Sequence, residues 1–145
     1  MIQEFHYEGK VIWSQVDANQ HMRHSAYADF AAQARIELLD KLGLDLTLLN
    51  KSNLGPILLR EEIIYLREVN LNDTLRVSCE FLHGKKDGSR WTIQHEIFRS
   101  DGVKAAIITV DGAWIDKIKR KMTSLDGELL KLFFKMPKSG HFIVD

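Results

Sequence analysis

The spacing of apolar residues changes at about residue 25, where a strand-like pattern gives way to the period of an α-helix. From residue 25 to residue 42, apolar side chains recur at i, i+3, i+4 and i+7, with the charged residues largely between them. These apolar positions are Tyr27, Phe30, Ala31, Ala34, Leu38 and Leu42. Ser25, or His24 just before it, is the expected N-cap, and Gly43 is the expected glycine after the last turn. Such a helix would be about 27 Å long.

Strand-like stretches lie on both sides of this helix. Residues 3–16 are predicted to form a strand with a turn near Glu8-Gly9. After the helix, residues 44–56 form an irregular connection with room for a short helical turn. Further strands are expected over residues 57–69, 75–81, 91–97 and 103–115.

Turn residues separate the later strands. We expect a loop over residues 84–89 and a two-residue hairpin turn at Asp101-Gly102. Gly112 lies inside the last strand, which indicates a bulge or a close approach of another chain segment. A short amphipathic helix over residues 126–134 and a loose tail are predicted to end the chain.

The order of these elements indicates the fold class. A strand, one long helix and then hairpin-linked strands are typical of an α+β protein, in which an antiparallel sheet covers the helix. Strands of about 12 residues would reach about 40 Å, which is long enough to curl around the helix. We expect one domain that comprises residues 1–145.

Composition and charge narrow the classes of function. The chain is 45% hydrophobic and 28% charged, which is typical of a globular protein. Its 20 basic and 20 acidic residues cancel, which argues against general nucleic-acid binding but leaves room for a local basic patch. No apolar signal segment and no run approaching ~18 apolar residues occurs, so we expect a cytoplasmic protein with no membrane partner.

Polar and titratable residues crowd between the first strand and the helix, in the sequence VDANQHMRHSAY at residues 16–27. An Asp before a helix is commonly a cap or an Asx-turn residue, so an ordinary loop is one interpretation and a reaction centre is the other. The lone cysteine, Cys79, lies far from His21 and His24 in sequence and is interpreted as a core residue. We therefore expect no metal site and no cofactor.

The motif Asp17-Ala18-Asn19-Gln20-His21 resembles the Asp-x-Asn-x-His signature of acyl-carrier-protein thioesterases. Tyr27 and the later Ala34-Arg35 pair resemble the 4-hydroxybenzoyl-CoA thioesterase superfamily. Weaker motifs follow in the order of that superfamily: Ile64-Tyr65-Leu66-Arg67-Glu68 with Asp73, and Gly112-Ala113-Trp114-Ile115-Asp116 with Arg120-Lys121. The resemblance covers roughly residues 5–125 and implies a hotdog fold, in which a curved antiparallel sheet wraps a long central helix.

The resemblance implies hydrolysis of an acyl thioester, either acyl-CoA or an acyl-carrier protein. Asp17 would act as general base on water or as nucleophile, and the sequence leaves both routes open. The backbone N–H of His24, at the start of the helix, would stabilise the oxyanion. Asn19 and His21 would support Asp17 or the substrate carbonyl through hydrogen bonds. Arg23-His24 stands where many relatives carry paired asparagines.

Four further residues are candidates for substrate binding. Tyr27 is interpreted as a core or pocket-wall residue, and Glu68 as a second carboxylate near the site or a solvated charge at a strand end. Arg120 and Lys121 belong to a basic cluster that could contact the phosphates of CoA. His95 shares an apolar strand face and is interpreted as a core histidine. Single hotdog units place the site between subunits, so we expect a homodimer or homotetramer.

Two alternatives to hydrolysis stay open. Hotdog hydratases and dehydratases that act on enoyl or hydroxyacyl thioesters carry the pattern Asp-x-Asn-Pro-x-His. This chain is one residue shorter and lacks the proline, which favours hydrolysis. A non-catalytic acyl-binding module is the other alternative, and it would account for the divergent Arg23-His24 pair.

Overall fold

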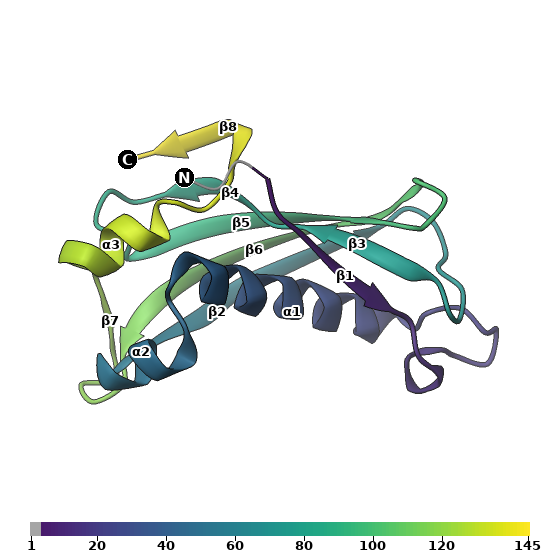
Figure 1. The fold of residues 1–145 in the computed structure, drawn as a ribbon, viewed down its shortest axis with the longest axis horizontal. Coiled ribbons are helices and arrows are strands. Elements are labelled where there is room, and N and C mark those ends of the chain that lie inside the picture. The colour runs from purple at the N-terminus through teal and green to yellow at the C-terminus, as the bar shows by residue number, and fades with distance from the viewer. Residues whose placement is uncertain (1–3) are drawn as a thin grey trace.

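The computed structural model describes residues 4–145, and a curved sheet wraps one long helix in it (Figure 1). The helices are α1 (His24–Leu42), α2 (Leu46–Lys51) and α3 (Gly127–Phe133), with a 3-10 turn η1 (Trp13–Gln15) before α1. The strands are β1 (His6–Lys10), β2 (Leu54–Tyr65), β3 (Thr74–Ser78), β4 (Glu80–Gly84), β5 (Arg90–Phe98), β6 (Lys104–Asp116), β7 (Lys121–Thr123) and β8 (Lys138–Val144). The α+β hotdog architecture is thereby confirmed.

The eight-stranded sheet has β2 at one edge, followed by β6 and β5. On the other side of β5, β3 and β4 pair with different parts of the same strand, β3 with its end and β4 with its first half. β1 then pairs with β3, and β8 pairs with β4. The β4–β8 pairing is parallel and the others are antiparallel. Among the described strands, β2 pairs with β6 alone, so one side of β2 is a free edge.

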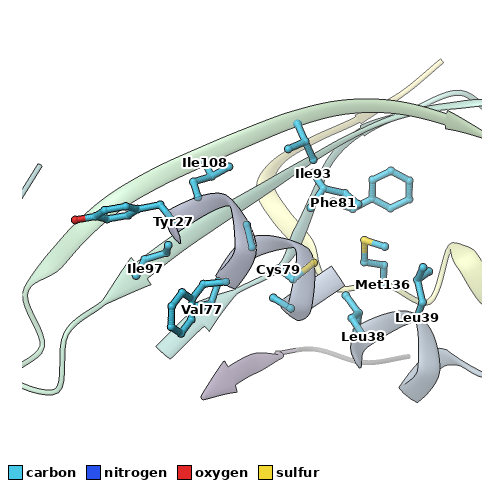
Figure 2. Packing of buried hydrophobic residues seen from close by; sticks show 14 of the residues in the cluster. Tyr27, Leu38, Leu39, Val77, Cys79, Phe81, Ile93, Ile97, Ile108 and Met136 are labelled. Carbon is cyan, nitrogen blue, oxygen red and sulfur yellow. The ribbon is translucent and has the colours of Figure 1, made fainter. Parts of the chain in front are cut away.

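The apolar face of α1 packs on the concave side of the sheet, as its 3.6-residue period predicts. All of the apolar positions predicted for this face are buried. Figure 2 shows Tyr27, Leu38 and Leu39 of this helix among the buried residues of the core, which include Cys79, Phe81, Ile108 and Met136. Gly43 ends the helix in the left-handed region at φ +93°, as expected. The N-cap is Arg23 rather than Ser25 or His24, because the extended backbone continues through Arg23.

The predicted turn at Glu8-Gly9 is wrong, because β1 runs straight through both residues. Gly9 is instead a site of close packing. A Cβ there would lie 2.5 Å from the Tyr7 hydroxyl and 3.0 Å from the Phe30 ring. Gly112 likewise marks the close approach that its position predicts, since a Cβ on it would lie 2.1 Å from the Trp91 ring.

Other boundaries differ from the prediction for local reasons. The strand expected over residues 57–69 begins at Leu54 and ends at Tyr65, and the strand expected over residues 75–81 is interrupted at Cys79. The turn between β5 and β6 spans residues 100–102 rather than two residues, since the Arg99 N–H donates to the Val103 carbonyl at 2.9 Å.

The end of the chain is ordered as a strand, so the prediction of a loose tail is wrong. β8 pairs with β4, and its Phe142 ring lies 5.0 Å from the ring of Phe81. The short helix predicted before it is confirmed as α3, and the predicted helical turn after α1 is confirmed as α2. No helix within residues 4–145 combines the length and the apolar character needed to cross a bilayer.

Candidate active site

The motif residues 17–21 form a tight turn between η1 and α1. The Asp17 N–H donates to the His21 carbonyl and the Gln20 N–H donates to the Asp17 carbonyl, both at 2.9 Å. Gln20 takes a left-handed conformation at φ +63°, which closes the turn. A β-bridge between His21 and Asn70 ties the turn to the segment after β2. These backbone hydrogen bonds therefore fix the position of the Asp17 Cα, from which its side chain extends.

The two carboxylate oxygens of Asp17 have different surroundings. Oδ1 accepts hydrogen bonds from the backbone N–H of Asn19 at 2.9 Å and of His21 at 3.3 Å. Oδ2 has no hydrogen-bond or ion-pair partner among residues 4–145, and the residue is exposed. This is an Asx-type turn that orients the carboxylate and leaves one oxygen available. Asn19 and His21 contact Asp17 through their backbone rather than through their side chains.

The helix start beside this turn offers unsatisfied backbone donors. His24 is the first residue of α1, and its N–H makes no hydrogen bond to any described residue. Arg23 fixes this end of the helix, because its side chain donates to the Ser14 carbonyl and to the Ser25 hydroxyl. Sequence reasoning assigned no role to Arg23. The sequence placed the N-cap at Ser25 or His24, and the distant Ser14 carbonyl that Arg23 contacts could not be read from it.

Two tyrosines form a wall beside the helix start. Tyr27 is buried, and its ring meets the ring of Tyr65 edge-to-face at 5.0 Å. The Tyr65 hydroxyl donates to the His24 carbonyl at 3.2 Å. Burial raises the pKa of the Tyr27 hydroxyl, with smaller contributions from Tyr65, Glu68 and Asp17. Of the two interpretations of Tyr27, the structure bears out the core residue, and the carboxylates of Glu68 and Asp17 lie near enough to influence its pKa.

Tyr65 was not predicted as a site residue, although it belongs to the motif Ile64-Tyr65-Leu66-Arg67-Glu68. Its alternating position near the end of a strand was the only signal. Glu68 is exposed, and its backbone carbonyl accepts a hydrogen bond from Arg99 at 3.1 Å. The Glu68 carboxylate has no hydrogen-bond or ion-pair partner within residues 4–145.

Arg120 and Lys121 lie away from Asp17 in the same chain. Arg120 is the last residue of the turn between β6 and β7, and Lys121 is the first residue of β7, so the two end a basic turn over residues 117–121. Lys117 anchors this turn to α2 by donating to the Asn50 side chain at 2.6 Å. Figure 1 shows this turn beside α2, at the opposite end of α1 from His24. One chain therefore does not bring the basic turn to the Asp17 carboxylate.

His95 and Cys79 are core residues, as predicted. The His95 Nδ1–H donates to the Ser78 carbonyl at 2.8 Å, so its Nε2 accepts from Arg35 Nη1 at 3.0 Å. Burial and the Arg35 charge lower the pKa of His95 to about 3. Burial raises the pKa of the Cys79 thiol to about 12. Within residues 4–145 no three His, Cys, Asp or Glu side chains gather as a metal-binding group.

Solved structures of other proteins resemble this chain in fold. A Staphylococcus aureus protein solved in complex with CoA superposes with a TM-score of 0.86 at 21% identity, over 96% of this chain and 89% of its own. DHNA-CoA thioesterase from Staphylococcus aureus gives a TM-score of 0.83 at 18% identity, over 92% of this chain and 91% of its own.

A 1,4-dihydroxy-2-naphthoyl-CoA thioesterase from Synechocystis gives a TM-score of 0.78 at 16% identity, over 91% of this chain and 93% of its own. The search of curated proteins returned no match to this chain. The family model described as thioesterase-like superfamily matches residues 11–133, and the chain belongs to this thioesterase-like superfamily.

Proposed function

We propose that this protein hydrolyses an acyl thioester, carried by coenzyme A or by an acyl-carrier protein, and that Asp17 is the attacking or base carboxylate. The observation that carries the proposal is the asymmetry of this carboxylate. One oxygen accepts hydrogen bonds from two backbone N–H groups, while the other has no partner within residues 4–145. The residue is exposed and precedes the start of α1, where the His24 N–H has no partner among the described residues either. Membership of the thioesterase-like superfamily supports the reaction class.

The chemistry needs few groups, because a thiol with a pKa near ~8.5 leaves readily as a thiolate. In the base route, Asp17 Oδ2 takes a proton from water and the hydroxide oxygen bonds to the thioester carbon. The tetrahedral intermediate then collapses, the C–S bond breaks, and the thiolate leaves and is protonated. In the nucleophilic route, Oδ2 itself bonds to that carbon, the C–S bond breaks, and water then hydrolyses the mixed anhydride. In both routes the carbonyl oxygen becomes an oxyanion, which the His24 N–H and the helix dipole would stabilise.

The remaining candidates have supporting roles in this proposal. Asn19 and His21 hold Asp17 through their backbone, which leaves both side chains free to donate hydrogen bonds to the substrate. Tyr27 would form the pocket wall and Glu68 would contact the substrate. The two Staphylococcus and Synechocystis neighbours named as thioesterases act on CoA esters, as their names state, which supports coenzyme A as the carrier.

We further propose a homodimer, alone or within a tetramer, in which the site is shared between subunits. The free edge of β2 exposes apolar side chains on both faces, at Leu58, Leu59, Ile64 and Tyr65. Arg60 lies beside Glu61 and Glu62, so the middle of the strand is self-complementary in charge under a two-fold axis.

An antiparallel β2–β2 pairing would set the start of one strand beside the end of its partner. The start, Leu54, pairs with Asp116 next to the basic turn, while the end, Tyr65, contacts His24. The pairing would therefore bring Arg120 and Lys121 of one subunit toward Asp17 of the other. Their charges suit the phosphates of CoA or the acidic groups of a carrier protein.

The test of the catalytic role is Asp17→Asn, measured as release of free thiol from a panel of acyl-CoA esters. Asparagine keeps an oxygen that can accept both backbone hydrogen bonds, so the turn should persist while turnover falls at least ~100-fold. Asp45→Asn is the matched control, because Asp45 also accepts a backbone N–H, from Leu48 at 2.8 Å, but at the far end of α1. Near-normal hydrolysis by Asp17→Asn would refute the assignment. With crotonyl-CoA, loss of the enoyl chromophore without thiol release would indicate a hydratase instead.

The test of the shared site is complementation between two impaired chains. Asp17→Asn is co-expressed with the double variant Arg120→Ala/Lys121→Ala. If each site uses Asp17 from one subunit and the basic turn from the other, a mixed dimer contains one intact site, and activity should recover toward about a quarter of wild type. If both groups act within one chain, every chain is defective and no recovery should occur. A monodisperse monomer that hydrolyses acyl-CoA would also contradict the proposal.

A further inference from the structure

The residue at the N-cap of α1 breaks the local rules for that position. Arg23 has the extended backbone of an N-cap, but its side chain makes no capping hydrogen bond. Asp, Asn, Ser and Thr are favoured there because a side-chain oxygen accepts a free N–H of the helix, which a guanidinium cannot do. A cation at this end of a helix also opposes the helix dipole. Arg23 therefore contributes nothing to α1 as a cap, and its value to the fold lies in its other contacts.

The Arg23 side chain links two segments of the chain that meet at this point. Its Nη1 donates to the Ser14 carbonyl in η1, and its Nε donates to the Ser25 hydroxyl in the first turn of α1 at 2.9 Å. The backbone N–H of Arg23 adds a third bond, to the Gln15 carbonyl at 2.8 Å. The N–H groups of a guanidinium lie in one rigid plane, so the two side-chain bonds hold η1 and the helix start in one relative position.

η1 depends on these bonds because packing does not hold it. None of its residues is buried. The chain is anchored on either side of it, at Val11, which is buried, and at Val16, which forms a β-bridge with Met22. Between these anchors, the hydrogen bonds that residues 12–15 make to other described segments all come from Arg23. The arm that leads into Asp17 is therefore held mainly by one side chain and its own backbone N–H.

Arg23 lies between the two groups that the proposed reaction uses. Asp17, the attacking or base carboxylate, follows η1 by two residues, and His24, whose N–H would stabilise the oxyanion, follows Arg23 directly. A shift of η1 relative to α1 would displace the Asp17 carboxylate from that N–H. Misplacement of a reacting group by about 1 Å can lower a rate about 100-fold.

We propose that Arg23 is a positioning residue for thioester hydrolysis, and that its two side-chain hydrogen bonds hold the arm carrying Asp17 against the start of α1. The inference rests on the proposed function, because it requires Asp17 and the His24 N–H to act on the same thioester. Arg23 itself does not contact the reacting atoms. Its loss should therefore lower kcat and leave KM nearly unchanged, since the alignment of the two groups matters in the transition state.

The first test compares wild type with Arg23→Met on the panel of acyl-CoA esters, because methionine keeps an unbranched apolar stem and has no N–H to donate. We expect kcat to fall at least ~10-fold and KM to change by less than about twofold. The urea midpoint should stay the same, as for most surface substitutions. Arg90→Met is the matched control, since Arg90 is exposed at the start of β5 and its side chain makes no hydrogen bond or ion pair with residues 4–145. A folded Arg23→Met protein with the kcat of wild type would refute the inference.

Two further variants separate the hydrogen bonds from the charge. Arg23→Lys keeps the positive charge but loses the planar fork, so it should recover little of the lost kcat. Full recovery would show that the charge acts rather than the pair of bonds, and would overturn the positioning role. Ser25→Ala removes only the acceptor on α1, so it should lower kcat in the wild type and cause no further loss in Arg23→Met. Independent losses that add in the double variant would contradict the proposed link.

Amide hydrogen exchange gives a readout that does not depend on catalysis. The Val16 N–H donates to a carbonyl of η1 at 3.3 Å, and the Asp17 N–H donates across its turn at 2.9 Å. Arg23→Met should speed exchange at both, because the arm opens more often, and should leave the Met22 N–H, which donates outside the loop at 2.7 Å, unchanged. Unaltered exchange at Val16 and Asp17 would refute the inference. A wild type that hydrolyses no ester would refute the proposed function and this inference with it, whereas an active wild type matched by Arg23→Met would refute this inference alone.

Discussion

The buried imidazole of His95 should make the fold sensitive to acid. Its relative exposure is 0%, its Nδ1–H donates to the Ser78 carbonyl, and its Nε2 accepts from Arg35. Protonation of Nε2 would place two cations in contact within the core and would remove the acceptor of that hydrogen bond. Burial and the Arg35 charge therefore hold the pKa of His95 at about 3 in the folded protein, against an ordinary value of 6.5 for histidine.

The sign and size of the effect follow from proton linkage. Below pH 6.5 the unfolded chain binds a proton on this histidine and the folded chain does not, so acid favours unfolding until the pH reaches about 3. At pH 5, which is 1.5 pH units below 6.5, the loss amounts to about 2 kcal/mol. At pH 4 it is about 3 kcal/mol. Domains are commonly stable by only about 5–15 kcal/mol, so the loss should be easy to measure.

The assay is urea unfolding of the wild type and of His95→Gln at about pH 7.5, 6, 5 and 4, which covers the range over which this histidine should lower the stability. Glutamine can donate to Ser78 and accept from Arg35 without titrating, so it keeps both hydrogen bonds. We expect His95→Gln to be less stable than wild type at pH 7.5, because its shape differs from a ring, and to close that gap as the pH falls. His141→Gln is the control, since His141 is exposed on β8.

The comparison between variants isolates this histidine from the carboxylates, which titrate in both proteins. If the free energies of wild type and His95→Gln fall in parallel between pH 7.5 and 4, the buried histidine does not resist protonation, and the reasoning is wrong. A gap that narrows equally for His141→Gln would show that the effect is not specific to the buried position.

Three further predictions test the packing. Gly112→Ala should cost at least about 1–3 kcal/mol in urea unfolding, because a Cβ there would lie 2.1 Å from the Trp91 ring, whereas Gly140→Ala, with nothing within 4 Å of a Cβ, should cost little. Phe142→Ala should speed amide hydrogen exchange across β8, because the Phe142 ring packs on Phe81. Ile143→Ala, at an exposed position, should leave the exchange rates unchanged. Equal exchange in both variants would mean that the Phe142–Phe81 contact does not hold β8 in place. The Cys79 thiol, buried and with its pKa raised to about 12, should resist alkylation at pH 8 in the folded protein and react in urea. Rapid alkylation without urea would contradict its burial.

The central helix could be predicted because its information is local. The 3.6-residue period of α1 identifies its buried face without knowledge of what covers it, and Gly43 ends it for a reason that depends on one residue. The fold class followed from the order of elements in the same way. Gly9 was misread as a turn residue, because glycine has two uses that the local sequence does not separate.

Features that depend on distant partners could not be read from the sequence. β8 is a strand because β4 offers it an edge, and that edge exists only after the sheet has formed. Arg35 stands among the charged positions that separate the apolar residues of α1, yet the curved sheet extends far enough around the helix to bury most of its side chain. The sequence identified Asp17 from its motif, but not the fact that one of its oxygens is held by backbone N–H groups.

The free edge of β2 connects stability with the proposed chemistry. A strand of 12 residues with apolar side chains on both faces is ordinarily a liability at an edge. In the proposed dimer the edge is covered, and the same pairing brings the basic turn to the Asp17 carboxylate. The Asp17 turn is closed by hydrogen bonds within one chain, so dissociation should leave it intact. Turnover per chain should therefore fall on dilution below the dimer dissociation constant, while the fold of each subunit persists. Turnover that does not depend on protein concentration across that range would show that pairing at the β2 edge is not needed for the reaction.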